Sequence, residues 1–285
     1  MLYKKSKEFQ VSGTTRVYAL IGDPVAHSIS PSFWNAALRH SEIDAIYIAM
    51  QVGKACAPAA FKGIEALSIA GINVTRPLKR MAAEYCHILN EPARSTGAVN
   101  TIRFSEHGGE GWNTDATGLL RILTRLDLRG RPALIMGNGA SAATAVWAIK
   151  KCTDAQIFIL GRSFAEQPAV NGLETWPADP QINCLAWNDK NFSYAAGESA
   201  IIVNTTPLGW STEDFVPELD KCLEKNKVFV DFNYAPDSKL VACARKSGCV
   251  VIDGRELLLE QGLESFEILT GCEAPAEIIR NCIYS

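Results

Sequence analysis

Short apolar segments alternate with helical segments along almost the whole chain, and this alternation constrains the fold more than any other feature. The strand-like segments cover residues 17–21, 45–50, 71–74, 98–104, 133–136, 156–160, 199–204, 227–232 and 249–252. The helical segments cover residues 31–38, 57–67, 115–126, 141–150, 238–246, 257–270 and 276–282. Strands that alternate with helices predict an α/β fold, in which mainly parallel sheets are covered by helices on both faces.

The length of the chain, 285 residues, exceeds the usual size of a single domain, so we expect two domains. We place the boundary just before the helix that leads into a glycine-rich segment. A first domain then covers residues 1–114 and a second covers 115–257. The C-terminal helices over 258–285 are expected to fold back onto the first domain. Residues 164–194 show no clear periodicity.

Charge and hydropathy exclude two classes of partner. The net charge is only −3, and Lys and Arg are not concentrated in any stretch, so nucleic-acid binding is not expected. The polar N-terminus lacks the apolar core of a secretory signal. No apolar run approaches the roughly 18 residues of a membrane span. We therefore expect a cytoplasmic protein that binds no membrane.

The cysteines are scattered, and their number, nine, is odd. None forms a C-x-x-C pair, and the four histidines lie far from them in the sequence. This pattern is typical of free thiols in a reducing compartment. We expect neither a metal site nor a disulfide.

A glycine-rich turn follows the apolar segment 133–136 and leads directly into a helix. Its sequence from Gly137 to Ala142 reads G-x-G-x-x-A, the pattern of a dinucleotide-binding β-α-β unit. Glycine permits the tight turn and the close approach of backbone N–H groups to a pyrophosphate, which the positive end of the helix also attracts. The sequence therefore predicts a Rossmann-like second domain that binds the cofactor through Gly137, Asn138, Gly139, Ala140 and Ser141.

The next strand of that unit ends at Gly161-Arg162-Ser163. An NAD site usually has an acidic residue here, which accepts the ribose hydroxyls. A guanidinium can instead pair with the 2′-phosphate of NADP. Arg162 therefore favours NADP, although this single basic residue leaves NAD open.

Polar motifs also follow the strand-like segments of the first half. They cover residues 22–31, 73–79, 97–101 and 111–115. Each has a purely structural explanation, because Ser30 can cap a helix that begins at Pro31, Asn73 can close a turn and Asp115 can cap a helix. Ligands of open α/β sheets nevertheless bind at such strand ends.

Taken together and in this order, the motifs resemble those of the shikimate dehydrogenase family over almost the whole chain. The match includes G-x-P-x-x-H-S-x-S-P, N-V-T-x-P-x-K, G-A-V-N-T and G-x-N-T-D, and it continues through residues 204–209, 231–236 and 254–261. The resemblance implies a substrate-binding first domain and an NADP-binding second domain. It also implies the reversible NADPH-dependent reduction of 3-dehydroshikimate to shikimate, in the chorismate pathway of aromatic amino acid biosynthesis.

The resemblance assigns roles to residues at both ends of the expected site. The residues implied to bind the substrate, by its carboxylate or around its ring, are Ser28, Ser30, Thr75, Asn100, Asp115, Tyr234 and Gln261. Phe232 and Gly254 are implied to lie along the nicotinamide, with Glu91 near it. Lys79 and Asp115 are implied to form the catalytic pair.

The chemistry of alcohol oxidation explains why such a pair is needed. Hydride leaves a carbinol carbon only as its oxygen loses a proton, and the reverse reaction needs a proton donor. A partly buried lysine amine can exchange that proton near neutrality, and a carboxylate can orient it. The residue types do not decide which group moves the proton, and we favour Lys79.

Several positions depart from the family pattern, and three of them bear most on the site. Trp34 stands where histidine is usual, Asn138 replaces the commoner alanine of the glycine loop, and Gly161 replaces the usual asparagine before Arg162. Two alternative functions therefore stay open. One is a quinate/shikimate dehydrogenase that uses NAD, and the other is a non-catalytic sensor of NADP or a ring acid. A monomer and a homodimer are both compatible with the sequence.

Overall fold

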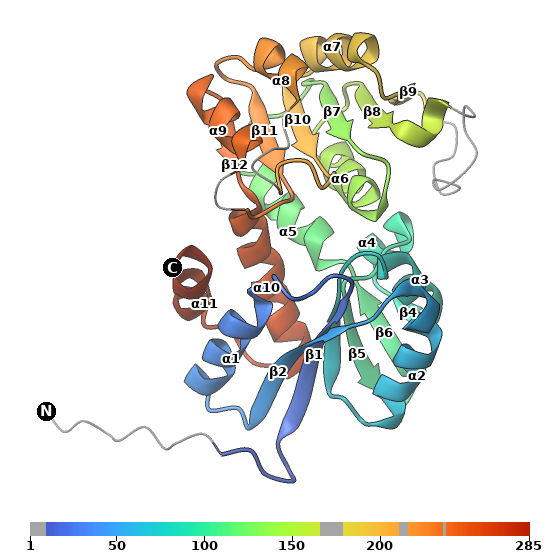
Figure 1. Ribbon diagram of the computed structural model, residues 1–285, viewed down its shortest axis with the longest axis vertical. Coiled ribbons are helices and arrows are strands. Elements are labelled where there is room, and N and C mark those ends of the chain that lie inside the picture. The colour runs from blue at the N-terminus through green and yellow to red at the C-terminus, as the bar shows by residue number, and fades with distance from the viewer. Residues whose placement is uncertain (1–9, 166–178, 211–215, 236–237) are drawn as a thin grey trace, which may run out of the picture.

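Two six-stranded sheets, one in each half of the chain, organise the molecule (Figure 1). The computed structural model describes residues 10–165, 179–210, 216–235 and 238–285. Helices cover both sheets, as the alternation of segments predicts, so the α/β class is confirmed.

The first sheet has the strand order β2-β1-β3-β5-β6-β4. Its strands are β1 (Arg16–Gly22), β2 (Ala45–Gln51), β3 (Gly71–Val74), β4 (Ile88–Leu89), β5 (Thr101–Ser105) and β6 (Gly108–Trp112). Its helices are α1 (Ser30–His40), α2 (Ala57–Ala66), α3 (Lys79–Tyr85) and α4 (Glu91–Thr96), with the short 3₁₀ turn η1 (Lys54–Cys56) before α2.

This sheet is mainly parallel, as expected, and its antiparallel pairs are confined to β5. Strand β5 runs antiparallel to both β3 and β6. Only Glu106 and His107 separate β5 from β6, and a link that short cannot hold the crossover that parallel strands require. The predicted strand 98–104 is also shifted, because residues 97–100 form a turn before β5.

The second sheet is parallel throughout, with the order β12-β11-β10-β7-β8-β9. Its strands are β7 (Ala133–Met136), β8 (Ile157–Gly161), β9 (Ile182–Ala186), β10 (Ile201–Asn204), β11 (Val228–Asp231) and β12 (Val250–Ile252). Its helices are α6 (Ala140–Lys150), α7 (Asp189–Glu198), α8 (Pro217–Cys222) and α9 (Lys239–Lys246), and η2 (Arg162–Ala165) follows β8. The strand order reverses at β7, the position where open α/β sheets bind dinucleotides.

Three further helices join the halves. Helix α5 (Thr114–Leu123) packs along α10 (Gly254–Thr270), and α11 (Ala276–Tyr284) packs against α1 (Figure 1). Phe266 and Leu269 of α10 and Ile279 of α11 share a buried cluster with Tyr18 and Phe33 of the first half. The C-terminal helices thus lie on the first half, while α10 begins at the second.

Among the residues that the structure places, no helix combines the length and apolar character that a membrane span needs.

Candidate active site

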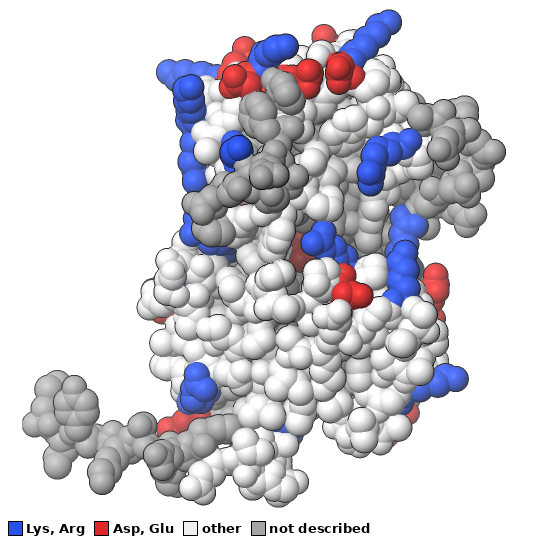
Figure 2. Space-filling model, viewed as in Figure 1, with Lys and Arg blue, Asp and Glu red and all other residues white. Residues whose placement is uncertain are grey.

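A cavity of about 450 Å³ lies between the two halves, lined by both. Figure 2 shows it as a hollow near the middle of the face, with basic side chains at its edge. The predicted residues that line it are Ser28, Ser30, Thr75, Lys79, Asn100, Asp115, Gly139, Ala140, Ser141, Phe232, Tyr234, Gly254 and Gln261. Its volume is in the range of sites for small organic ligands.

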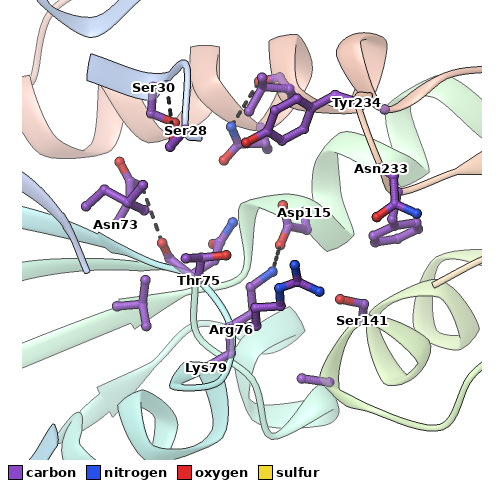
Figure 3. Close-up of a pocket in the computed structure, with 18 of the residues that line it drawn as sticks. Ser28, Ser30, Asn73, Thr75, Arg76, Lys79, Asp115, Ser141, Asn233 and Tyr234 are labelled. Carbon is purple, nitrogen blue, oxygen red and sulfur yellow. Dashed lines mark hydrogen bonds and ion pairs between the residues drawn. The ribbon is translucent and has the colours of Figure 1, made fainter. Parts of the chain in front are cut away.

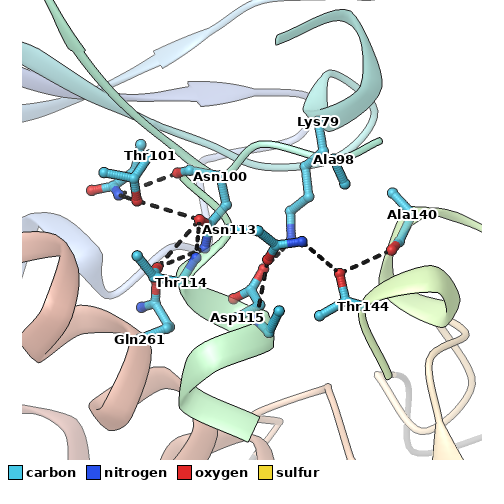
Figure 4. A network of polar contacts seen from close by, with 12 residues as sticks. Lys79, Ala98, Asn100, Thr101, Asn113, Thr114, Asp115, Ala140, Thr144 and Gln261 are labelled. Carbon is cyan, nitrogen blue, oxygen red and sulfur yellow. Dashed lines mark hydrogen bonds and ion pairs between the residues drawn. The ribbon is translucent and has the colours of Figure 1, made fainter. Parts of the chain in front are cut away.

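Lys79 and Asp115 meet at the centre of this cavity (Figures 3 and 4). Lys79 Nζ donates to Asp115 Oδ2 at 2.5 Å, and the two side chains are only 15% and 13% exposed. Lys79 is the first residue of α3, and Asp115 lies in the first turn of α5. The pair is therefore positioned by two helix starts.

Asn113, not Asp115, caps helix α5. Its Oδ1 accepts a hydrogen bond from the N–H of Ala116 at 3.1 Å, so the capping explanation for Asp115 is wrong and its carboxylate faces Lys79. Asn113 Nδ2 also donates to Thr144 Oγ1 of α6 at 3.0 Å (Figure 4). One residue thus joins the helix that carries the Asp115 carboxylate to the helix that follows the glycine loop.

A buried hydrogen-bond network holds Asn100 in place. Asn100 Oδ1 accepts from the N–H of Thr114 at 2.8 Å, and this bond fixes the start of α5 beside Asp115. Asn73 Nδ2 donates to Asn100 O at 3.3 Å and to Ser265 Oγ at 2.6 Å. On its other side, Asn73 Oδ1 accepts a hydrogen bond from Tyr47 Oη at 2.8 Å. Asn73 therefore does not simply close a turn.

Ser28, Ser30 and Tyr234 form the hydroxyl end of the cavity (Figure 3). Ser28 Oγ accepts from the N–H of Ser30 at 3.2 Å, and Ser30 is the first residue of α1 without making a cap, which corrects its predicted capping role. Burial raises the pKa of Tyr234, and the neighbouring Ser28 hydroxyl partly offsets that rise. The Tyr234 hydroxyl is thus a neutral donor at pH 7.

Trp34, Arg76 and Asn233 are among the cavity-lining residues to which the sequence analysis gave no role in the site. Trp34 is 1% exposed and stacks on Tyr47, with ring centroids 4.7 Å apart. A sequence signal for Trp34 existed, because it lies one helical turn beyond Ser30 and therefore on the same helix face. Asn233 gave no such signal, since its place depends on the loop that carries it.

The glycine loop leaves an open cradle at the N-terminus of α6. Gly137 has a φ of 108°, which favours glycine, and a Cβ there would lie 2.7 Å from Thr205 Oγ1. A Cβ at Gly139 would meet no atom within 4 Å, and no side chain caps the first N–H groups of α6. Space and free N–H donors at a helix start fit the pyrophosphate of a dinucleotide.

The remaining predicted cofactor residues lie outside the cavity lining. Asn138 and Arg162 follow the carboxyl ends of the neighbouring strands β7 and β8, and Arg162 is exposed. Glu91 begins α4, and its Oε1 accepts from Trp147 Nε1 at 3.1 Å. The structure therefore shows Glu91 as a link between α4 and α6.

Asp231 holds together the two loops that form the wall opposite Lys79. It is fully buried, and its carboxylate accepts from Asn204 Nδ2 and the N–H of Asn233, both at 3.0 Å. Asn233 Nδ2 in turn donates to Thr206 O at 2.9 Å. Burial raises the pKa of Asp231 to about 6 despite these hydrogen bonds.

Because the folded-state pKa of Asp231 exceeds its ordinary value of 3.8, the protonated form favours folding. Its contribution to stability is complete below pH 4 and is lost as the pH rises through about 6, at a cost on the order of 3 kcal/mol. We expect Asp231→Asn to gain stability relative to the wild type between pH 4 and pH 8, measured by urea unfolding. The exposed Asp127→Asn is the control. The prediction would be contradicted if the free energies of unfolding of Asp231→Asn and the wild type differed by the same amount at pH 4 and at pH 8.

Comparisons with known proteins show which proteins this chain is similar to. Residues 20–102 match the model of the shikimate dehydrogenase substrate binding domain, and residues 254–281 match that of the shikimate 5′-dehydrogenase C-terminal domain. The shikimate dehydrogenase (NADP(+)) of Anaeromyxobacter sp. (strain Fw109-5) is 36% identical over 96% of this chain and 97% of that protein.

Two solved structures extend the likeness to the fold. The crystal structure of Aquifex aeolicus shikimate dehydrogenase has a TM-score of 0.83 at 30% identity, over 97% of this chain and 100% of that one. Shikimate 5-dehydrogenase from Listeria monocytogenes, in complex with shikimate and NAD, has a TM-score of 0.79 at 27% identity, over 95% and 97% of the two chains. On sequence and fold together, this chain belongs to the shikimate dehydrogenase family.

Proposed function

We propose that this protein catalyses the reversible NADPH-dependent reduction of 3-dehydroshikimate to shikimate. The observation that carries the proposal is the Lys79–Asp115 pair, which lies inside one cavity together with the hydroxyl cluster and the start of α6. An acid/base pair, a carboxylate-binding end and a dinucleotide cradle are the parts that this reaction needs.

The hydroxyl groups of Ser28, Ser30 and Tyr234 would bind the ring carboxylate, because hydrogen bonds to an ionised acceptor are charge-assisted. Thr75, which lines the same cavity, would contact the ring hydroxyls. Gln261 Nε2 donates one N–H to Leu258 O at 2.9 Å and keeps a second for the ring. Asn100 fixes the start of α5 and offers one remaining N–H.

Lys79 would move the proton. The nicotinamide cofactor, when bound, supplies the hydride that reaches the carbonyl carbon of 3-dehydroshikimate. The Lys79 ammonium gives its proton to the carbonyl oxygen, and the neutral amine then regains a proton from solvent. In the oxidation of shikimate the neutral amine takes the hydroxyl proton. Asp115 holds Nζ in place through their 2.5 Å contact.

We assign substrate binding to residues 1–114 with the C-terminal helices 258–285, and NADP binding to 115–257. The packing of α11 on α1 and the position of the glycine loop before α6 support this division. Gly137, Gly139, Ala140 and Ser141 would hold the pyrophosphate. Phe232 and Gly254 would border the nicotinamide, and Arg162 would meet the 2′-phosphate.

The test is the appearance of reduced nicotinamide when purified protein meets shikimate and NADP. Formation of NADPH from shikimate supports the proposal. Equal or better turnover of quinate with NAD would favour the quinate/shikimate alternative, and the exposed, solitary Arg162 is the feature that keeps it open. Binding of both ligands without turnover would show a sensor instead.

We also infer a cytoplasmic enzyme, since its nine free cysteines are typical of a reducing compartment. Sedimentation velocity would distinguish the monomer from the homodimer.

A further inference from the structure

The side chain of Asn138 lies between the glycine loop and the end of β8. Its Nδ2 donates to Ser163 Oγ at 2.5 Å. A Cβ added to Gly161 would lie 2.8 Å from both Cγ and Nδ2 of Asn138. The carboxamide therefore occupies the space that a side chain at position 161 would need, so Asn138 and Gly161 fit each other.

This edge of the sheet is where a dinucleotide's adenosine ribose binds, because it joins the glycine loop to the end of the second strand of the β-α-β unit. Sites for NAD have a carboxylate here, and sites for NADP have a cation. In this chain the exposed Arg162 lies between Gly161 and Ser163, the two residues that meet the uncharged carboxamide of Asn138. Among the described residues no partner takes the Asn138 Oδ1 or its second N–H, so both are free for a ligand.

We propose that Asn138, oriented by Ser163, determines the preference of this protein for NADP over NAD. The inference rests on the proposed dinucleotide site and assigns its selectivity to a residue of the glycine loop rather than to Arg162 alone. An uncharged amide at position 138 leaves the local charge positive, which suits a 2′-phosphate. The bond from Asn138 Nδ2 occupies an acceptor site of Ser163 Oγ, so the Ser163 O–H is left to donate outward.

Asn138→Asp is the decisive variant, because it introduces a negative charge while it keeps the size and shape of the side chain. The carboxylate has no N–H, so the contact with Ser163 can persist only if the Ser163 hydroxyl donates to it, and that hydroxyl is then no longer available to a phosphate. The carboxylate repels a phosphate but accepts a hydrogen bond from a ribose hydroxyl. We expect the Kd for NADPH to rise about tenfold or more, while the Kd for NADH stays within about twofold or falls.

The readout is equilibrium titration of NADPH and NADH by nucleotide fluorescence, which does not depend on turnover. The control is Asn226→Asp, which adds the same charge just before β11. Asn226 lies at the amino ends of the parallel strands, whereas the glycine loop lies at their carboxyl ends. This control should leave the ratio of the two Kd values unchanged. An Asn138→Asp ratio equal to that of the wild type would overturn the inference. Wild-type protein that binds neither dinucleotide would overturn the proposed function itself.

A second set of variants tests whether Asn138 acts on the cofactor by orienting the Ser163 hydroxyl. Asn138→Ala and Ser163→Ala should each weaken NADPH binding several-fold, and the double variant should be no weaker than the single ones, because both remove the same oriented hydroxyl. Losses that add fully in the double variant would show that Asn138 does not act through Ser163. These alanine variants still test the inference if Asn138→Asp fails to fold.

Discussion

Replacement of Lys79 by alanine is expected to lower kcat by about 10²–10⁴-fold, the usual contribution of a positioned acid or base. Nζ lies 2.5 Å from the Asp115 carboxylate, and the side chain of Lys79 is only 15% exposed. Water is therefore a poor substitute for the missing ammonium. The measurement is steady-state turnover of shikimate with NADP, with Kd values for both ligands determined separately.

The matched control for this variant is Lys62→Ala, which removes an exposed lysine of α2 and should leave kcat unchanged. Asp115→Asn should also lower kcat, but less, because the amide can still hold the amine in place. If Lys79→Ala kept kcat within about threefold of the wild type, the proton would have to come from another group, and the proposed role of Lys79 would be wrong.

Gly254→Ala is expected to lower kcat/KM by about 100-fold, because displacement of a site by about 1 Å has an effect of that size. A Cβ at Gly254 would lie 2.3 Å from the backbone oxygen of Asn233 and 2.7 Å from the backbone nitrogen of Tyr234. Backbone atoms cannot rotate away as a side chain does, so the loop that carries Tyr234 must move away from the Ser28 hydroxyl. Most of the loss should appear in the KM for the ring acid.

Gly63→Ala is the control for this prediction. Gly63 lies within α2, and a Cβ there would meet no atom within 4 Å. Alanine should therefore leave activity unchanged and raise the free energy of unfolding by about 0.5–1 kcal/mol. Normal turnover in Gly254→Ala would show that the loop accommodates the methyl group and that the position of Tyr234 is not critical.

The second sheet could be predicted strand by strand where a strand is a short, mostly apolar run. All residues of β7, β10 and β11 are buried, and a short continuous apolar run bounded by turn residues indicates a strand covered on both faces. Strand β6 was missed, because the sequence Gly-Gly-Glu-Gly-Trp has almost no intrinsic tendency to extend. Its pairing with β5 makes it a strand.

The region 164–194 was also missed as structure. Strand β9 lies within its described part and helix α7 begins there, and β9 pairs with β8 at the edge of the sheet. Its side chains are half-exposed, so no clear apolar pattern marks it. Residues 166–178 of that region lie outside the described residues.

The alternating α/β order and the glycine loop could be predicted from the sequence, because backbone preference and spacing are local properties that short motifs record. Lys79 and Asp115 were named as the expected catalytic pair through the resemblance of their motifs to those of the family. The tertiary structure alone decided that Lys79 and Asp115, 36 residues apart, meet at 2.5 Å. It also decided that Glu91 receives the indole N–H of Trp147. Such pairings follow from how distant helices pack against two sheets, and packing depends on the shape of the whole chain rather than on any one segment.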